Sequence, residues 1–331
     1  MKILIATGIY PPDIGGPARY AKELADAVKG LGHEVKVLPY RLERKLPFGI
    51  RQLWYLARCL FAASSADAII ALDTVSVGFP AVVASFLMGK KVAVRTGGDF
   101  LWEAYLERTG YELPLPAFYK IMPPLSFRER VIQKIHQFLL DYTDFMVFST
   151  AWQRDIWLSF YTISEIKVRI IENCYHPKRS GRTPQKKIFL GSARDIVMKN
   201  LDNVKEAFAD AKNKMPELEL DLRPYPPEEY DEKLRTCYAV VIASLGDISP
   251  NSIIEAVSFD KPFILTKYNG IEKRLGGAGI IVDPLDTRGM AEAFLKLSKK
   301  DEYDKELQKV RKITFTHSYE EIAKEFLNLF V

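Results

Sequence analysis

Runs of consecutive apolar residues alternate with amphipathic stretches along almost all of the 331 residues. A run that is apolar at every position is typical of a strand buried on both faces, as the strands of a parallel sheet are. The first run, residues 3–6, is followed by a glycine pair, by Pro17 in the expected first turn of a helix, and by apolar residues at helical spacing. The alternation predicts parallel sheets covered by helices, which is the α/β class.

The alternation runs through the chain twice, and a segment with the composition of a linker separates the two series. Residues 173–187 are polar and basic and contain Pro177, Gly181 and Pro184, so we expect the connection and its hinge there. The strands expected in the first series are residues 3–6, 34–38, 68–72, 92–95, 145–149 and 168–172, and those in the second are 188–190, 218–222, 239–243, 263–266 and 280–282.

Three regions follow from this pattern: a doubly wound domain at residues 1–175, a second at residues 176–317, and a helix at residues 318–331. The helix has four apolar residues on one stripe, Tyr319, Ile322, Phe326 and Leu329. It must therefore pack against an apolar surface. Ligands of open α/β sheets bind beyond the carboxyl ends of the strands, so the residues that follow the strands are the candidates for a functional site.

The composition excludes several classes of protein. Hydrophobic residues make up 48% and charged residues 27% of the chain, which is typical of a folded globular protein. The 47 Lys and Arg against 42 Asp and Glu leave a net charge of +5, too small an excess to indicate a nucleic-acid partner. The three cysteines are too far apart for a zinc site or a disulfide framework, and the apolar start is too short for a signal peptide. We expect a cytoplasmic protein.

The loop after the first strand of the second series carries two cations, Arg194 and Lys199, and a helix follows it. Two cations at the carboxyl edge of a sheet suit a diphosphate, which arginine binds with forked hydrogen bonds and lysine as a point charge. The alternative is that both are solvated surface side chains, which is the usual environment of Lys and Arg.

A second polar loop follows the strand at residues 239–243 and opens the next helix. Asp247 lies before that helix and Glu255 within it, between two pairs of apolar residues. The free N–H groups expected from Asn251 to Ile253 suit phosphate oxygens, and carboxylates accept hydrogen bonds from a ribose diol. The alternative is a helix cap at Asp247 or Asn251 and a surface position for Glu255.

In the first domain, Gly15 and Gly16 precede a helix whose first N–H groups lack partners, so an anionic group or a sugar could approach the backbone there. The sequence has no dinucleotide-binding fingerprint, no phosphate-binding P-loop and no His and Cys cluster for a metal. A dehydrogenase, a P-loop phosphotransferase and a metal-dependent hydrolase are therefore disfavoured.

These motifs, in this order and over nearly the whole chain, resemble those of the GT-B glycosyltransferases, specifically glycosyltransferase family 4. The matching segments are residues 15–25, residues 167–173, the pair Arg194 and Lys199, the acidic motif at residues 247–255, and residues 261–264. The resemblance implies two Rossmann-like domains facing across a cleft, with the C-terminal helix returning to the first domain. It also implies transfer of a sugar from a nucleoside-diphosphate donor, with retention at the anomeric carbon.

The resemblance also implies roles for individual residues. Arg194 and Lys199 would hold the donor diphosphate and stabilise it as a leaving group, Glu255 would bind the ribose, and Gly15 and Gly16 would close over the donor. The transferred sugar and a phosphate would be bound by Asp247 and the loop after it, including Ser249, Asn251, Ser252 and Ile253.

Four features depart from the family pattern, and one of them is the loop after Asp247, which reads Ile248-Ser249-Pro250 where the family usually has a glycine. The first acid of the motif is Asp247 where the family usually has Glu, and Asp99 follows the strand after which many members have a His. Asp99 is therefore a candidate for contact with the donor sugar or the acceptor hydroxyl, although Asp is also a frequent helix cap. The usual glycine-rich turn after residue 222 is absent, so base recognition is expected to differ.

The leading hypothesis is a hexosyl-type glycosyltransferase that needs no cofactor and no metal, uses a UDP- or GDP-sugar, and acts on a glycan or lipid-linked acceptor. A second hypothesis is a non-catalytic GT-B scaffold that binds a sugar nucleotide or a partner glycosyltransferase. It is motivated by the altered acidic loop and by the second domain, which the missing turn after residue 222 shortens. A third is a sugar-nucleotide epimerase, which would consume the donor without an acceptor.

Residues 41–60 combine basic and aromatic side chains. The basic ones are Arg41, Arg44, Lys45 and Arg51, and the apolar ones include Phe48, Leu53 and Trp54. This combination suits peripheral contact with the anionic inner face of a membrane, and the alternative is a domain helix with a solvated basic edge. A membrane span is not expected, because Asp73 and Pro80 interrupt the apolar stretch at residues 68–88.

Overall fold

The computed structural model describes residues 1–13, 15–47, 49–191 and 194–331, and for Leu42, Arg44 and Pro227 the backbone alone. Four residues of the sequence motifs lie outside the described residues, namely Ile14, Phe48, Ser192 and Ala193, as does the side chain of Arg44.

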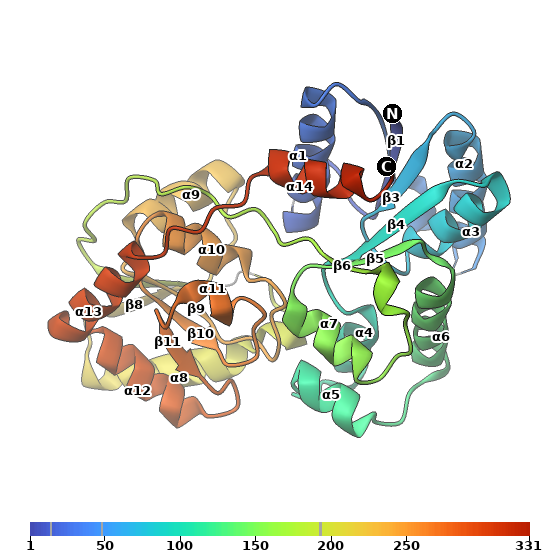
Figure 1. Cartoon of the computed structure of the whole chain (residues 1–331). Coiled ribbons are helices and arrows are strands. Elements are labelled where there is room, and N and C mark those ends of the chain that lie inside the picture. Colours follow the sequence, from blue (N-terminus) through green and yellow to red (C-terminus); the bar gives the residue numbers. More distant parts are fainter. Residues whose placement is uncertain (14, 48, 192–193) are drawn as a thin grey trace. The chain divides into compact units, whose positions relative to one another are not determined.

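The chain divides into two compact units (Figure 1). The first consists of Met1–Ala104, Met122–Cys174 and His317–Val331, and the second of Tyr105–Ile121 and Tyr175–Thr316. The chain passes into the main part of the second unit after Cys174, next to the boundary expected after residue 175. The packing of Tyr105–Ile121 with the second unit was not predicted from the sequence.

The first unit is built on a parallel sheet. In the described residues its strands have the order β2-β1-β3-β4-β5-β6, and every neighbouring pair is parallel. The strands are β1 Lys2–Thr7, β2 Glu34–Pro39, β3 Ala68–Ala71, β4 Lys91–Thr96, β5 Phe145–Phe148 and β6 Val168–Ile170. All of β3, and all of β1 after Lys2, are buried because helices cover both faces of the sheet.

Helices of the first unit cover this sheet and connect its strands. They are α1 Gly16–Gly30, η1 Leu42–Lys45, α2 Ile50–Ala63, α3 Gly78–Met88, the start of α4 Phe100–Thr109, α6 Phe127–Tyr142, α7 Ala151–Leu158, η2 Glu165–Lys167 and α14 Tyr319–Asn328.

The C-terminal helix α14 packs against α1. Ile322 and Phe326 are fully buried in the same core cluster as Leu24 of α1. Tyr319 contacts Tyr20 edge to face, with the ring centres 5.7 Å apart. The prediction that this helix returns to the first domain is confirmed.

The second unit is built on a second parallel sheet, with the strand order β11-β10-β9-β7-β8 in the described residues. Its strands are β7 Lys187–Gly191, β8 Leu218–Asp221, β9 Ala239–Ile242, β10 Phe263–Thr266 and β11 Ile280–Val282. The chain adds β8 on one side of β7 and β9 on the other. The winding therefore reverses between β7 and β9, and this reversal is the switch point of the sheet.

The helices of the second unit lie on both faces of this sheet. They are the end of α4, α5 Leu115–Ile121, η3 Val197–Lys199, α8 Leu201–Lys214, α9 Pro227–Thr236, α10 Asn251–Ser258, α11 Glu272–Leu275, α12 Thr287–Leu297 and α13 Lys300–Arg311. Phe189, Phe208 and Phe294 form part of the core on one face. Across the described residues of both units, no helix combines the length and the apolar character needed to cross a membrane.

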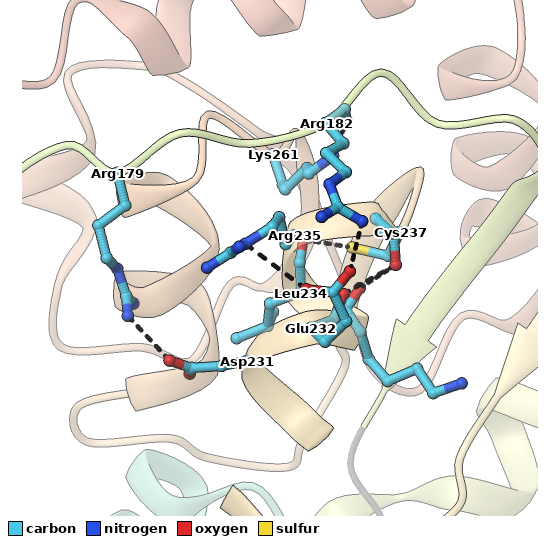
Figure 2. A network of polar contacts seen from close by, with 10 residues as sticks. Arg179, Arg182, Asp231, Glu232, Leu234, Arg235, Cys237 and Lys261 are labelled. Carbon is cyan, nitrogen blue, oxygen red and sulfur yellow. Dashed lines mark hydrogen bonds and ion pairs between the residues drawn. The ribbon is translucent and has the colours of Figure 1, made fainter. Parts of the chain in front are cut away.

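Part of the segment expected as a linker is fastened to α9 (Figure 2). Arg179 pairs with Asp231 at 3.1 Å, and Arg182 pairs with Glu232 at 2.8 Å. The N–H of Arg182 also donates to the carbonyl of Arg235, at the end of the same helix. This part of the predicted hinge region is therefore held by the second unit.

Lys261 closes the same network (Figure 2). The residue is 2% exposed, and its ammonium donates to the carbonyl oxygen of Arg182 at 2.7 Å. Burial lowers the pKa of this amine, and the nearby Cys237 and Asp260 oppose the shift. A buried ammonium needs a hydrogen-bond acceptor, so Lys261 binds the backbone of the linker segment to the core.

Candidate functional site

Two loops meet at the switch point of the second sheet. One follows β7 and contains η3, and the other follows β9 and leads into α10. The N–H of Leu245 in the second loop donates to the carbonyl of Met198 in the first at 2.9 Å. Because β7 and β9 are parallel neighbours, their carboxyl ends bring both loops to one edge. This edge is where a ligand of such a sheet binds.

Lys199 and Asp247 form an ion pair across these loops. The ammonium Nζ lies 2.8 Å from Oδ2 of the carboxylate, and each side chain is 13% exposed. The hydroxyl of Ser244 donates to the same carboxylate at 3.4 Å. Lys199 and Asp247 were predicted separately as site residues, and the structure brings them into contact. The ammonium of this pair can bind a phosphate, and the carboxylate can accept hydrogen bonds from sugar hydroxyls.

Asn200 shapes the first loop, and the sequence analysis gave it no role. Its backbone is left-handed, with φ 55° and ψ 38°, a conformation that Asn tolerates better than most residues. Its side-chain amide donates to the carbonyls of Ala243 at 3.0 Å and Pro284 at 2.7 Å. Asn200 thereby ties the first loop to the second, directly beside Lys199. The signal in the sequence is an Asn immediately before a helix.

Arg194, the other predicted cation, lies near the beginning of the first loop with an exposed side chain. In the part of the chain that the structure describes, this side chain pairs with no acid. The two residues before it, Ser192 and Ala193, lie outside the described residues. Contact of Arg194 with a diphosphate stays a prediction.

The helix after the second loop, α10, closes its first turn on Pro250. The N–H groups of Ile253 and Ile254 donate to the Pro250 carbonyl at 3.0 and 3.2 Å. The N–H of Ile253 is therefore not the unpaired donor that the sequence analysis expected. Ser249, just before Pro250, has a buried Oγ with no hydrogen-bond partner among the described residues. A hydroxyl in this state can complete its hydrogen bonding with a ligand or with water.

Ser252 and Glu255 lie near Tyr230, a residue of α9 that the sequence analysis did not select. Tyr230 shares a hydrogen bond with Ser252, and the charge of Glu255 acts on its phenol. Burial raises the pKa of Tyr230 well above the ordinary value, and Glu255 adds to the shift. The phenol is therefore neutral and can donate a hydrogen bond. Asn251 begins α10 with an exposed side chain.

The segment Tyr105–Ile121 reaches both loops of the second unit. Oε1 of Glu107 accepts a hydrogen bond from the N–H of Val197 at 3.1 Å. The N–H of Leu115 donates to the carbonyl of Leu245 at 3.2 Å. No pattern in the sequence pointed to this contact, because the segment lies between two strands of the first sheet. It braces the loops that carry Lys199 and Asp247.

The comparisons with known proteins differ between sequence and structure. No family model matches the chain, and no curated protein matches its sequence. Solved structures match over the whole length. Sucrose-phosphate synthase from Thermosynechococcus elongatus has a TM-score of 0.72 at 12% identity, covering 99% of this chain and 98% of that chain. HepE from Anabaena, solved with UDP and glucose, has a TM-score of 0.68 at 11% identity and the same coverage. WaaG, described as a glycosyltransferase involved in lipopolysaccharide biosynthesis, has a TM-score of 0.73 at 13% identity and covers 99% of both chains.

The chain has the GT-B fold. Both of its sheets are the parallel, doubly wound sheets of this architecture, as the sequence analysis predicted. At 11% to 13% identity these structures show the fold alone, so membership of family 4 stays a prediction.

Gly15 and Gly16 of the first unit lie at the start of α1. Gly15 occupies the cap position with φ 144°, which strongly favours glycine. Gly16 is the first residue of the helix, and both glycines are exposed. Their closing over a donor stays a prediction.

Asp99 is buried in the first unit and has both carboxylate oxygens engaged. Oδ1 accepts from the N–H of Trp102 at 2.9 Å, and Oδ2 accepts from Nε1 of Trp157 at 2.8 Å. The residue is 1% exposed and directly precedes α4. These contacts are those of the helix-cap alternative, and a role of Asp99 in catalysis stays a prediction.

Proposed function

We propose that the protein is a glycosyltransferase that moves a sugar from a nucleoside diphosphate to a glycan or lipid-linked acceptor. The observation that carries the proposal is the Lys199–Asp247 pair at the switch point of a GT-B second unit. HepE, which shares the fold, is solved with UDP and glucose, and this supports a UDP-sugar as the donor, with a GDP-sugar as the alternative.

Lys199 changes partner when the donor binds. In the structure, its charge is balanced by Asp247, with Nζ and Oδ2 2.8 Å apart. The donor diphosphate becomes more negative as the anomeric bond breaks, so a fixed ammonium stabilises the transition state more than the ground state. Arg194 adds forked hydrogen bonds from the same loop. In this proposal the two cations stabilise the leaving group without a metal ion or other cofactor.

The remaining polar groups of the site bind the other parts of the donor. Asp247, released by Lys199, accepts hydrogen bonds from hydroxyls of the transferred sugar. Ser249, whose buried Oγ lacks a partner in the described residues, donates to a phosphate oxygen. Glu255 accepts from the ribose diol, with the neutral phenol of Tyr230 beside it.

Other parts of the proposal follow the family 4 resemblance alone. They are membership of that family, transfer of a hexose, and retention at the anomeric carbon. The residues assigned on the same basis are Asn251, Ser252 and Ile253 for the sugar and phosphate, Gly15 and Gly16 for the donor, and Asp99 for the donor sugar or the acceptor hydroxyl.

We further propose a cytoplasmic protein that lies on the inner face of a membrane through residues 41–60. Leu53 and Trp54 of α2 are 68% and 51% exposed, and Phe86 at the end of the neighbouring α3 is 76% exposed. Apolar side chains of this kind insert at the lipid interface, and the basic residues of the region attract anionic headgroups.

A ligand screen by thermal unfolding tests the donor site. The ligands are UDP, GDP, ADP, TDP and their sugars, each with and without EDTA. A ligand that binds only the folded state raises its stability. We expect one nucleoside diphosphate to stabilise the protein to the same extent with and without EDTA. The Lys199→Ala variant should not be stabilised by it. No shift at millimolar ligand would overturn the proposal.

Product analysis separates the three hypotheses. A transferase yields a glycosylated product only when a glycan or lipid-linked acceptor is present. Consumption of the donor without any acceptor would instead identify an epimerase. Stabilisation by a nucleotide without turnover on a broad acceptor panel would identify a non-catalytic scaffold.

A further inference from the structure

The first unit buries a cation for which the described residues offer no acidic partner. Arg95 lies at the carboxyl end of β4 and is 6% exposed. Its Nη2 donates to Oγ of Ser149 at 2.9 Å and to Oδ1 of Asn173 at 2.5 Å, and both acceptors are neutral. Among the described residues, no carboxylate pairs with its guanidinium. A buried charge without a counter-charge is costly, so its presence needs an explanation.

The face of this guanidinium, its Nε and its Nη1 each have a different environment. The ring of Tyr20 covers its face at 4.1 Å. Nε is buried and has no hydrogen-bond partner in the described part of the chain. Nη1 lies against Gly97, where a Cβ atom would be only 2.6 Å away. Gly97 is exposed, so Nη1 is the part of this guanidinium that lies next to an exposed residue.

The loop after β4 adds a backbone donor at the same place. Neither the N–H of Gly97 nor that of Gly98 donates to a protein group within the described residues. The carbonyl of Gly98 accepts from Oγ1 of Thr96 at 2.7 Å and from Nε2 of Gln153 at 3.2 Å, which holds the loop in place. Oε1 of Glu103 lies against Gly98, where a Cβ atom would be 2.7 Å away, and it accepts from the N–H of Asp99 at 3.1 Å. The N–H of Gly97, beside Nη1 of Arg95, is therefore the backbone donor that suits an anion.

From these observations we infer that the first unit binds an oxyanion, a phosphate or a carboxylate, between Arg95 and the N–H group of Gly97. The oxyanion supplies the missing counter-charge and accepts the free donors. The inference rests on the proposed function in one respect. Since the donor diphosphate is assigned to the second unit, the acceptor carries this oxyanion and is an acidic glycan or a phosphate-bearing lipid.

The test measures binding of two probes, glycerol 3-phosphate and glucuronate, to the full chain by thermal unfolding at constant ionic strength. Lys199→Ala removes the cation assigned to the donor, so that binding in the second unit is suppressed. We expect this variant to bind at least one probe as the wild type does. Arg95→Gln is expected to bind that probe at least about tenfold more weakly, because a charge-assisted hydrogen bond is lost. The preferred probe distinguishes a phosphate-bearing from a carboxylate-bearing acceptor.

Gly97→Ala is a second variant, used because Arg95→Gln can fail to fold. It keeps Arg95 and places a methyl group against Nη1. We expect it to lose probe binding. Gly30→Ala is the matched control, since a Cβ there meets no atom within 4 Å, and it should bind the probe normally.

Three results would overturn the inference: no probe binding by the wild type at millimolar concentration, loss of all probe binding in Lys199→Ala, or unchanged binding in Gly97→Ala or in folded Arg95→Gln. Binding of UDP is measured in parallel. Absence of UDP binding counts against the proposed function and leaves the result at Arg95 unaffected, so the two failures are distinguishable.

Discussion

At the residue scale, Lys199 and Asp247 contribute to stability and, in the proposed function, to binding of the donor. Each side chain is 13% exposed, so each charge depends on the other for compensation. Removing one partner leaves the other charge without compensation in a partly desolvated place. The same residues are therefore expected to show effects on the free energy of unfolding and on turnover.

Lys199→Ala is expected to lower kcat about 100-fold or more, the size of effect found when one group that stabilises a developing charge is removed. It should also destabilise the second unit by about 1–3 kcal/mol. The double variant Lys199→Ala, Asp247→Ala should lose less stability than the two single variants together, because no charge remains unpaired. Initial rates and denaturant unfolding followed by circular dichroism measure both quantities.

The matched control for this pair is Lys205→Ala. Lys205 and its partner Asp202 are 51% and 91% exposed, so this variant should change stability by no more than about 0.5 kcal/mol. Additive losses in the Lys199 and Asp247 variants would contradict the coupling.

His136 makes the stability of the first unit depend on pH. It is fully buried, with Nε2 at 3.2 Å from Oγ1 of Thr74 and Nδ1 at 3.2 Å from the hydroxyl of Tyr161. Burial lowers the pKa of His136 to about 3. Below about pH 6.5 the unfolded chain takes up a proton that the native state does not bind until about pH 3. This contribution therefore destabilises the fold as the pH falls, by about 2 kcal/mol at pH 5.

His136→Asn is expected to reduce the loss of stability between pH 7 and pH 5 by that amount, measured as the free energy of unfolding at both values. Asp73 has the opposite effect on the pH dependence of stability. Burial raises its pKa to about 6, so as the pH falls the native state binds a proton at Asp73 before the unfolded chain does. The prediction therefore concerns the difference between variant and wild type. If His136→Asn and the wild type lose the same free energy of unfolding between pH 7 and pH 5, His136 is not responsible for the pH dependence.

At the element scale, α14 completes a core whose other members lie far away in the sequence. Phe326 is fully buried there, so Phe326→Ala is expected to destabilise the first unit by about 3–5 kcal/mol. Fluorescence reports this unit alone, because all four tryptophans, Trp54, Trp102, Trp152 and Trp157, lie in it. Phe127→Ala is the control, since Phe127 is 76% exposed and its loss should cost less than about 0.5 kcal/mol.

The bracing segment Tyr105–Ile121 provides a second prediction at this scale. Glu107 accepts from the loop of Lys199, and Glu112 accepts from Asn203 of α8 at 3.0 Å. Replacing both acids by Ala is expected to weaken UDP binding about threefold to tenfold, since one hydrogen bond contributes about 1 kcal/mol. Glu292→Ala, in an exposed ion pair of α12, is the control for a lost surface charge. Equal UDP affinity in the wild type, the double variant and Glu292→Ala would contradict the proposed role of Tyr105–Ile121 in holding the loops.

At the scale of the whole molecule, the net charge of +5 favours contact with anionic surfaces. Binding to phosphatidylglycerol-containing vesicles should weaken as salt is added, because exposed charges are screened beyond about 10 Å at 0.1 M salt. Leu53→Ser with Trp54→Ser should reduce vesicle sedimentation at every salt concentration, whereas Phe127→Ser, another exposed aromatic, should not. Equal binding to neutral phosphatidylcholine vesicles would contradict a role for charge.

The sequence was sufficient for most of the fold because strand and helix signals are local. The runs that became β1 and β3 are apolar at nearly every position, as burial on both faces requires. The helix α13 was missed because the structure buries only Glu306 and Val310 of its 12 residues, which leaves no apolar stripe to recognise. Arg194, Lys199, Asp247 and Glu255 were selected because parallel strands place the loops after them at one edge.

The sequence by itself determined the two parallel sheets, the order of the elements and the loops in which charged residues stand. Only the tertiary structure decided which charges meet. Lys199 pairs with a residue 48 positions away, the first turn of α10 uses the N–H of Ile253, and Arg95 is buried without an acidic partner among the residues that the structure describes. Apolar periodicity is a property of neighbouring residues, whereas the partner of a polar atom depends on segments that only folding brings together.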